Sequence, residues 1–289
     1  MKICIITDDN AGFTNEEAQE LGIKIIKMPV LIDGEEHFEN ITLSTDEFYK
    51  KLANGADIKT SQPAPGEVLK VWDETLKTYD AIIHIPMSSG LSESCNTATV
   101  LAQDYKGKVF VVNNHRISVT LKSSVRDALN MAKDGKSPEE IKEYLEKDAY
   151  QSAIYVMVDT LKYLVKGGRI TPAAALIGGA LHIKPILTIL GEKLDAYKKV
   201  IGTKKGKIAL LSAIQDELKM RFKDYSKEDL CFQMAYTFEL EAAIEFRKEF
   251  AESLGINEDQ IELNPLSLSV ATHIGPGALA LTVSHIYKK

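Results

Sequence analysis

The sequence predicts an α/β protein with two domains: an α/β domain with a parallel sheet over residues 1–150, and an α+β domain with a mainly antiparallel sheet over residues 151–289. In the first half, short apolar runs alternate with helical segments, which is typical of a parallel sheet with helices on its faces. In the second half, apolar runs follow one another across short turns, which favours an antiparallel sheet. A length of 289 residues suits two ordinary domains.

The elements of the first half are marked by apolar runs and by helix caps. Thr14 with Glu17, and Ser44 with Glu47, form capping boxes, and Asp33-Gly34 is a hairpin signal. The predicted strands are Lys2–Thr7, Ile23–Ile32, Ala81–Pro86 and Lys108–Val112. The first three predicted helices run from Thr14 to near Gly22, over Asp46–Ala53, and from the end of the loop Lys59–Gly66 to Lys77. The next three run from about Ser92 to Tyr105, over Val119–Lys133, and from the cap at Ser137-Pro138 onward.

The second half contains more strands than helices. Lys193–Val200 is predicted to pair with Ile183–Leu190 across a turn at Gly191. The other predicted strands are Ala153–Val158, Leu230–Tyr236 and Gln260–Leu266, with further apolar runs around Val270 and over Ala278–Ile286. One helix is predicted to follow the strand Lys193–Val200 and to end at Phe222, and another to cover Leu240–Leu254.

Composition argues against several classes of partner. Hydrophobic residues make up 45% and charged residues 26%, with a net charge of -6 and no basic stripe, so we expect neither nucleic acid nor anionic membrane as a partner. The most apolar stretch, Ala173–Leu190, contains His182, Lys184 and Pro185, so stable membrane insertion is not expected. The chain enters a strand pattern directly and has 3 scattered cysteines, which favours a cytoplasmic protein. The six histidines show no metal-ligand spacing, and no cofactor is expected.

The loop Met87–Ser92 is the first candidate binding segment. It follows a predicted parallel strand and precedes a helix, and ligands of open α/β sheets bind at such strand ends. Helix N-termini and the hydroxyls of Ser89 and Ser92 suit an anion. The alternative is that Ser92 merely caps the helix, and both roles are compatible.

The loop from Thr60 to Glu67 is the second candidate. Two prolines stiffen it, and it too precedes a helix. Thr60 and Ser61 offer hydroxyls and Gln62 offers an amide. The alternative is a rigid connector with a capping residue.

Two later segments could add charged or ionisable donors. Lys166-Gly167-Gly168-Arg169 combines a tight turn with two cations, but it does not match a P-loop. Thr272–Gly277 carries His273 beside a turn, where a histidine could donate to a carboxylate or act as a base. The alternatives are a glycine turn with solvated charges and a structural histidine.

Taken in order, these segments resemble the DegV family of bacterial fatty-acid-binding proteins, the FakB type. The resemblance covers essentially the whole chain. It rests on Thr60-Ser61-Gln62-Pro63, Leu91-Ser92, Leu161-Lys162-Tyr163-Leu164 with Lys166-Gly167-Gly168-Arg169-Ile170, Ile183-Lys184-Pro185-Ile186-Leu187, and Thr272-His273-Ile274-Gly275-Pro276-Gly277.

The resemblance implies a carrier that binds one long-chain fatty acid, such as palmitate, stearate or oleate, in a buried tunnel over which the C-terminal domain closes. It implies that Thr60 and Ser92 hold the carboxylate and that Arg169 and His273 match further polar positions near it. It also implies a separate fatty acid kinase as a partner in lipid transport and metabolism, with no catalysis by the carrier. The small residues of Ala173–Leu190 could line the tunnel, or could belong to an ordinary core helix.

The sequence departs from the family pattern near the expected head group. Glu93-Ser94 stand where Gly-Thr is usual, and Asn113-Asn114 where Asp-Ser is usual. Glu93 should weaken carboxylate binding unless it points outward or pairs with a cation. Two other functions stay open from the residues alone: a serine-dependent acyl hydrolase or transferase using Ser92 and His273, which lacks a nucleophile elbow, and a binder of a phosphorylated small molecule using Lys166–Arg169.

Overall fold

The computed structural model describes residues 1–176 and 183–289, and these divide into two compact units. The first unit contains residues 1–150 and 286–289, and the second contains residues 151–285. The last four residues join the first unit because the N–H of Tyr287 donates to Asp127 at 3.0 Å and its hydroxyl to Asp134 at 3.2 Å. The hydrophobic pattern of the sequence does not indicate which unit these last four residues pack against. That the second unit closes over a lipid tunnel stays a prediction.

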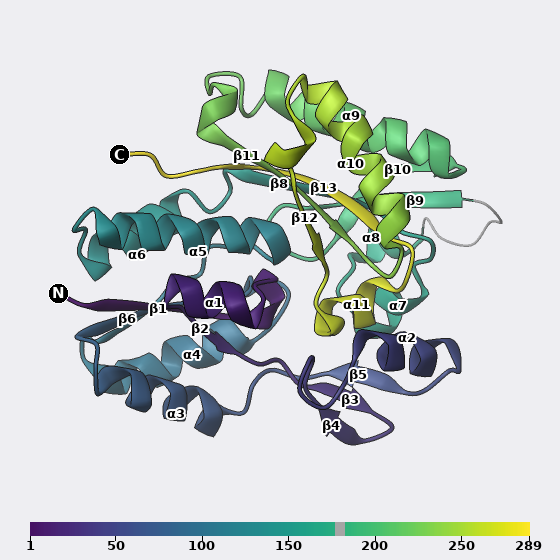
Figure 1. Cartoon of the computed structure of the whole chain (residues 1–289). Helices are drawn as coiled ribbons and strands as arrows, with labels where there is room; N and C mark the ends of the chain where they lie inside the picture. Colours follow the sequence, from purple (N-terminus) through teal and green to yellow (C-terminus); the bar gives the residue numbers. More distant parts are fainter. Residues whose placement is uncertain (177–182) are drawn as a thin grey trace. The chain divides into compact units, whose positions relative to one another are not determined.

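The first unit contains the predicted parallel sheet (Figure 1). Its four strands lie in the order β2-β1-β6-β7, and every neighbouring pair is parallel. The carboxyl ends of β1 and β6 therefore meet at one edge. The strands are β1 Ile3–Asp8, β2 Lys24–Ile26, β6 Ala81–Ile85 and β7 Val109–Val111.

Helices cover both faces of this sheet. Helices α3 and α4 contact it on one face, whereas α5 and α6 contact it on the other (Figure 1). The capping boxes at Thr14 and Ser44 form as expected, and Ser137 makes a third. The helices are α1 Asn15–Leu21, α2 Thr45–Ala53, α3 Pro65–Leu76, α4 Ser94–Ala102, α5 Ser118–Lys133 and α6 Pro138–Lys147, with 3-10 turns η1 Asp9–Ala11 and η2 Gln103–Tyr105.

A small antiparallel sheet of order β4-β3-β5 also belongs to the first unit. The single strand predicted over Ile23–Ile32 is wrong, because the chain leaves the parallel sheet after β2 and re-enters strand only at β3, past Pro29, which lacks a backbone N–H. The hairpin at Asp33-Gly34 is confirmed, with φ of 52° and 90°. The strands are β3 Val30–Ile32, β4 Glu35–His37 and β5 Ile58–Thr60, the last of which was expected to be a loop from Lys59 onward.

The second unit is built on a six-stranded sheet of order β10-β9-β8-β13-β11-β12. All neighbours are antiparallel except β11 and β12, which confirms a mainly antiparallel sheet. The predicted pairing across Gly191 is confirmed by β9 and β10. The strands are β8 Ser152–Met157, β9 Ile183–Ile189, β10 Asp195–Ile201, β11 Leu230–Tyr236, β12 Glu262–Pro265 and β13 Leu279–His285.

Two long helices, α9 and α10, contact the six-stranded sheet and enclose a core with Phe222, Phe246 and Phe250. The apolar run around Val270 forms a helix, α11, which contacts α7. The helices are α7 Lys162–Gly167, α8 Pro172–Ala175, α9 Thr203–Lys219, α10 Leu240–Leu254 and α11 Leu268–Ile274, with 3-10 turns η3 Lys227–Asp229 and η4 Glu258–Gln260.

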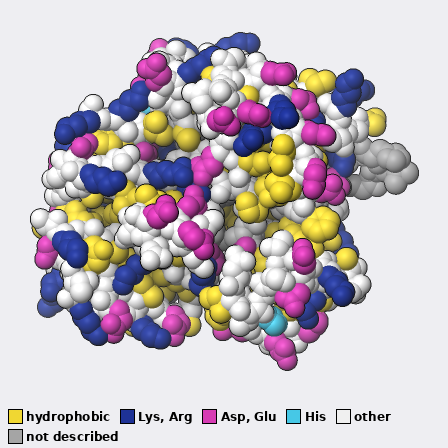
Figure 2. All heavy atoms as spheres, viewed as in Figure 1, with side chains coloured by type: hydrophobic (Ala, Val, Ile, Leu, Met, Phe, Trp, Pro, Cys, Tyr) yellow, Lys and Arg dark blue, Asp and Glu magenta, His cyan; other side chains and the backbone are white. Residues whose placement is uncertain are grey.

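The surface carries both signs of charge. On the face shown in Figure 2, basic and acidic side chains are interspersed, in keeping with the modest net charge of -6. Over the two described ranges, no helix is long and apolar enough to cross a membrane.

Candidate functional site

The loop Met87–Ser92 is a compact turn at the carboxyl end of β6. The carbonyl of Ser88 accepts from the N–H groups of Leu91 and Ser92, at 3.0 and 3.1 Å. At the neighbouring strand end, Asp8 accepts from the N–H of Met87 at 2.8 Å. Asp8 therefore ties the end of β1 to the loop that follows β6.

The hydroxyls of Ser92 and Ser89 are positioned by hydrogen bonds that they accept. Ser92 Oγ accepts from the N–H of Ser94 at 3.2 Å, and Ser89 Oγ accepts from Nδ2 of Asn113 at 2.7 Å. A serine hydroxyl that accepts one bond still has its own proton to donate. The helix begins at Ser94, two residues later than predicted, and Ser92 orders its start through the bond to the N–H of Ser94.

The second hydroxyl loop is attached to the same helix. Thr60 is the half-buried last residue of β5, where it pairs with Val30. Beyond it, Oε1 of Gln62 accepts from the Thr97 hydroxyl at 3.0 Å, which joins this loop to α4. The exposed Ser61 hydroxyl donates to the carbonyl of Gln62 at 2.9 Å, so its proton is already engaged.

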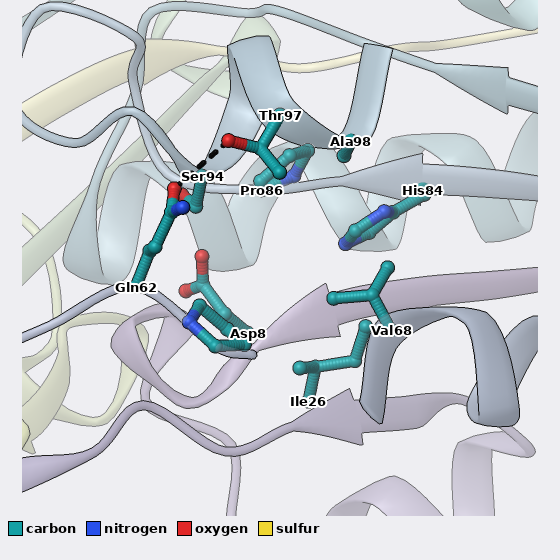
Figure 3. Close-up of a pocket in the computed structure, with 10 residues that line it drawn as sticks. Asp8, Ile26, Gln62, Val68, His84, Pro86, Ser94, Thr97 and Ala98 are labelled. Atoms are coloured by element: carbon teal, nitrogen blue, oxygen red, sulfur yellow. Dashed lines mark hydrogen bonds between the residues drawn. The ribbon is translucent and has the colours of Figure 1, made fainter. Parts of the chain in front are cut away.

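A pocket lies beside these loops within the first unit (Figure 3). Its empty volume is about 300 Å³ including its open mouth, yet its interior admits about one water molecule, so a longer ligand would have to part its walls. One set of lining residues is apolar: Ile26, Pro63, Val68, Pro86 and Ala98. The other set is polar: Asp8, Gln62, His84, Ser94 and Thr97.

Two buried acids stand at the end of β1. Burial raises the pKa of Asp8 to about 6, against the opposing effect of the N–H groups of Met87 and Asn10. Burial and the neighbouring Asp8 charge raise the pKa of Asp9 to about 8, although Asp9 accepts from the N–H of Met28 at 3.2 Å. At neutral pH, Asp9 is therefore mainly protonated.

His84 is a pocket residue that the sequence analysis missed. It stands fourth in β6, where all five residues are buried, and its side chain points into the pocket (Figure 3). Burial lowers its pKa to about 3, so the imidazole is neutral. A polar residue inside a continuous apolar run is the signal that could have identified it.

The segments carrying Arg169 and His273 come together within the second unit. A Cβ atom at Gly167 would lie 2.0 Å from Nδ1 of His273, so any larger residue would force that ring to move. Burial and the nearby positive charge of Arg169 lower the pKa of His273 to about 4. The guanidinium of Arg169 donates to the carbonyl of Gly167. His273 is therefore mainly neutral at pH 7, so its ring can donate one hydrogen bond and accept another.

Two more glycines of this region make close approaches. A Cβ at Gly275 would lie 2.4 Å from the ring of Tyr163, and one at Gly277 would lie 2.8 Å from Asp159. Asp159 forms an ion pair with Lys184 of β9. The family-like segments of the second half therefore converge on one another in space.

The departures from the family pattern have visible consequences. Glu93 is exposed and accepts from Nδ2 of Asn96 at 2.8 Å, so its charge points outward. Asn113 exchanges bonds with Ser89, through its own amide and the N–H of that serine. Both changes leave the serine loop formed.

Part of the segment predicted to line the tunnel lies outside the described residues, including its small residues Gly178, Gly179 and Ala180. Of the remainder, Ala174 is buried, whereas Leu176 is 86% exposed. Among the residues in the two described ranges, no group of three or more His, Cys, Asp and Glu side chains is arranged to hold a metal ion.

The fold and these loops define a two-unit α/β protein with hydroxyl-bearing loops at the carboxyl ends of its parallel strands. A family model described as "Uncharacterised protein, DegV family" matches residues 2–285. The chain belongs to the DegV family.

Individual relatives agree with this assignment. A DegV domain-containing protein of Listeria innocua is 31% identical over 286 residues, and one of Staphylococcus aureus is 28% identical over 282; each comparison covers 98% of both chains. Among solved structures, a DegV family protein of Thermus thermophilus, described as fatty acid binding, superposes with a TM-score of 0.88 at 26% identity over 99% of this chain and 100% of that one. DegV of Bacillus subtilis, described as a fatty acid binding protein, gives 0.82 at 26% identity over 99% of both.

Proposed function

We propose that this protein binds one long-chain fatty acid non-covalently and holds its carboxylate with the hydroxyls of Thr60 and Ser92, with Ser89 and Ser61 beside them. The observation that carries the proposal is the fixed Ser92 hydroxyl, which accepts from the N–H of Ser94 and keeps a proton for an anion. The 26%-identical structures described as fatty acid binding support the choice of ligand. Palmitate, stearate and oleate are the acids to test.

The neutral hydroxyl donors suit a carrier that must release its ligand. Each buried methylene of the tail contributes about 0.8 kcal/mol, so the hydrocarbon supplies most of the affinity and the hydroxyls set the orientation of the head. An exposed carboxylate could then be passed to a separate fatty acid kinase that forms an acyl phosphate. A partner that uses ATP would place the protein in the cytoplasm, which cell fractionation checks.

Native mass spectrometry of the purified protein tests the ligand. We expect a bound mass of one long-chain fatty acid, or uptake of one equivalent of labelled palmitate or oleate. A protein that is repeatedly empty and takes up neither acid would refute the proposal. The kinase step is tested with the loaded protein and ATP, since acyl phosphate should form only when a fatty acid kinase is added.

The same spectra distinguish the carrier from an acyl-transfer enzyme. A carrier loses its ligand on denaturation, whereas an acylated Ser92 would keep the added mass. For the second unit, we propose that Arg169 and His273 act as polar ligand-binding groups. A loss of acid retention in Arg169→Gln or His273→Gln supports that role, and unchanged retention in both contradicts it. A preference for a phosphorylated small molecule over fatty acid would favour Lys166–Arg169 as a phosphate site instead.

A further inference from the structure

His84 is an unusual lining residue for a pocket that would hold a hydrocarbon chain, because its side chain is polar. It lies between Ile6 of β1 and Val111 of β7 in register, in the interior of the parallel sheet, and is only 3% exposed. Its side chain points into the pocket, beside Val68 and Ala98 (Figure 3). A leucine or isoleucine at this position would be the ordinary lining for a fatty acid tail.

The polar atoms of this wall are not satisfied by the protein. Within residues 1–176 and 183–289, neither Nδ1 of His84 nor Oγ of Ser94 has a hydrogen-bond partner, and both atoms are buried. Ser94 is 9% exposed and also lines the pocket. The contact that His84 makes with Trp72 is an edge-on packing of rings, with centroids 5.5 Å apart.

The other polar residues of the pocket are already engaged. Asp8 accepts from the N–H groups of Met87 and Asn10, and Gln62 accepts from Thr97. Burial keeps His84 neutral, so its ring offers one N–H donor and one acceptor nitrogen. Within the described residues, the pocket wall therefore carries one imidazole nitrogen and one hydroxyl whose hydrogen bonds are left for an occupant of the pocket.

We propose that His84 and Ser94 make this pocket selective for fatty acids that carry a hydroxyl group along the chain, over unsubstituted acids of the same length. The inference rests on the proposed fatty acid binding and adds the class of acid preferred. An unsubstituted tail would leave both polar atoms dry and unpaired, which is costly. A hydroxyl that lies against either group can exchange a hydrogen bond with it, so its own desolvation is compensated.

A positional series of monohydroxystearates, tested against stearate by competition for the wild-type protein, measures this preference. We expect one position, or two adjacent positions, to bind about tenfold more tightly than stearate, and the rest no more tightly. Equal affinity for stearate and every hydroxystearate overturns the inference while the proposed function stands. That is also the result if a trapped water satisfies both groups. Binding of neither stearate nor any hydroxystearate contradicts the proposed function itself.

Variants identify the groups responsible. In His84→Leu with Ser94→Ala, the preferred hydroxystearate should lose its advantage while stearate binds as well as before or better. His84→Asn, which keeps a donor and an acceptor, should retain part of the preference. If the preference persists in the double variant, the two residues are not its source. Should that variant fail to fold, the wild-type series still decides the question.

Discussion

The candidate binding residues of the two units are held in place by different means. In the first unit, the hydroxyls of Ser89 and Ser92 are positioned by hydrogen bonds from Asn113 and from the N–H of Ser94. In the second, the ring of His273 occupies the space that a side chain at Gly167 would otherwise fill. Loss of one hydrogen bond leaves the backbone around it in place, whereas an atom added at Gly167 would force the partly buried His273 ring to move.

Burial shifts the pKa of a titratable side chain in each unit, upward for an acid and downward for a base. In the first it raises the pKa of Asp9 to about 8, and in the second it lowers the pKa of His273 to about 4. Both shifts favour the neutral form, because removing a charge from water is costly. Asp9 and His273 should therefore change the stability of the protein with pH in opposite directions.

The largest expected effect is on ligand binding in the first unit. In Thr60→Ala with Ser92→Ala, affinity for palmitate should fall by at least about 100-fold, because two bonds to a carboxylate are lost and each is worth about 1.5–3 kcal/mol. Equilibrium binding of labelled palmitate measures it. A matched control is Thr78→Ala with Thr99→Ala, whose hydroxyls donate to backbone carbonyls outside the pocket. Unchanged affinity in the first double variant would show that the head group sits elsewhere.

The glycine contact is the test of the second unit. Gly167→Ala should lower the free energy of unfolding by about 2 kcal/mol, because the new Cβ lies 2.0 Å from Nδ1 of His273. Gly66→Ala is the control: Gly66 lies in α3 with open space around it, and alanine should stabilise the helix by about 0.5–1 kcal/mol. Urea unfolding measures both. An unchanged free energy of unfolding in Gly167→Ala would mean that the His273 ring moves aside without cost.

Asp9 tests the pH response of the first unit. Its raised pKa means that the wild-type protein loses stability as pH rises from about 4 through about 8, since the unfolded state releases the proton more readily. Asp9→Asn should therefore gain about 1 kcal/mol of unfolding free energy relative to wild type between pH 6 and pH 7. A constant difference over that interval would show that Asp9 is ionised in the folded state.

His273 tests the opposite response in the second unit. Its lowered pKa means that stability is lost as pH falls from about 6.5 towards about 4, because the unfolded state takes up the proton first. His273→Gln should therefore gain about 1 kcal/mol of unfolding free energy relative to wild type as the pH falls from 6 to 5. Denaturant unfolding at several pH values measures it. A gain in the other direction would mean that an acidic partner holds His273 charged.

The smallest expected effect is at Glu93, where the sequence departs from the family pattern next to Ser92. Glu93→Gln should change palmitate affinity by less than about twofold, because the carboxylate is exposed and bonded to Asn96. A marked rise in affinity would show that Glu93 turns inward in the loaded protein.

Much of the fold could be predicted because its signals are local. Thr14 with Glu17 and Ser44 with Glu47 form their capping boxes, and Asp33-Gly34 forms its hairpin, since each depends on a few neighbouring residues. The strand break before Val30 and the short strand β5 were missed. Strands of three residues are too short for a period of two to be recognised.

The sequence by itself determined the two sheet types, the family and the loops that carry hydroxyls. Only the tertiary structure decided which groups meet: Gln62 with Thr97, Asp8 with Met87, and Gly167 with His273. It also placed His84 in the pocket wall. In the sequence, His84 is simply the one polar residue among the four apolar residues of its strand. Contacts between residues distant in the chain depend on packing, which local sequence patterns do not encode.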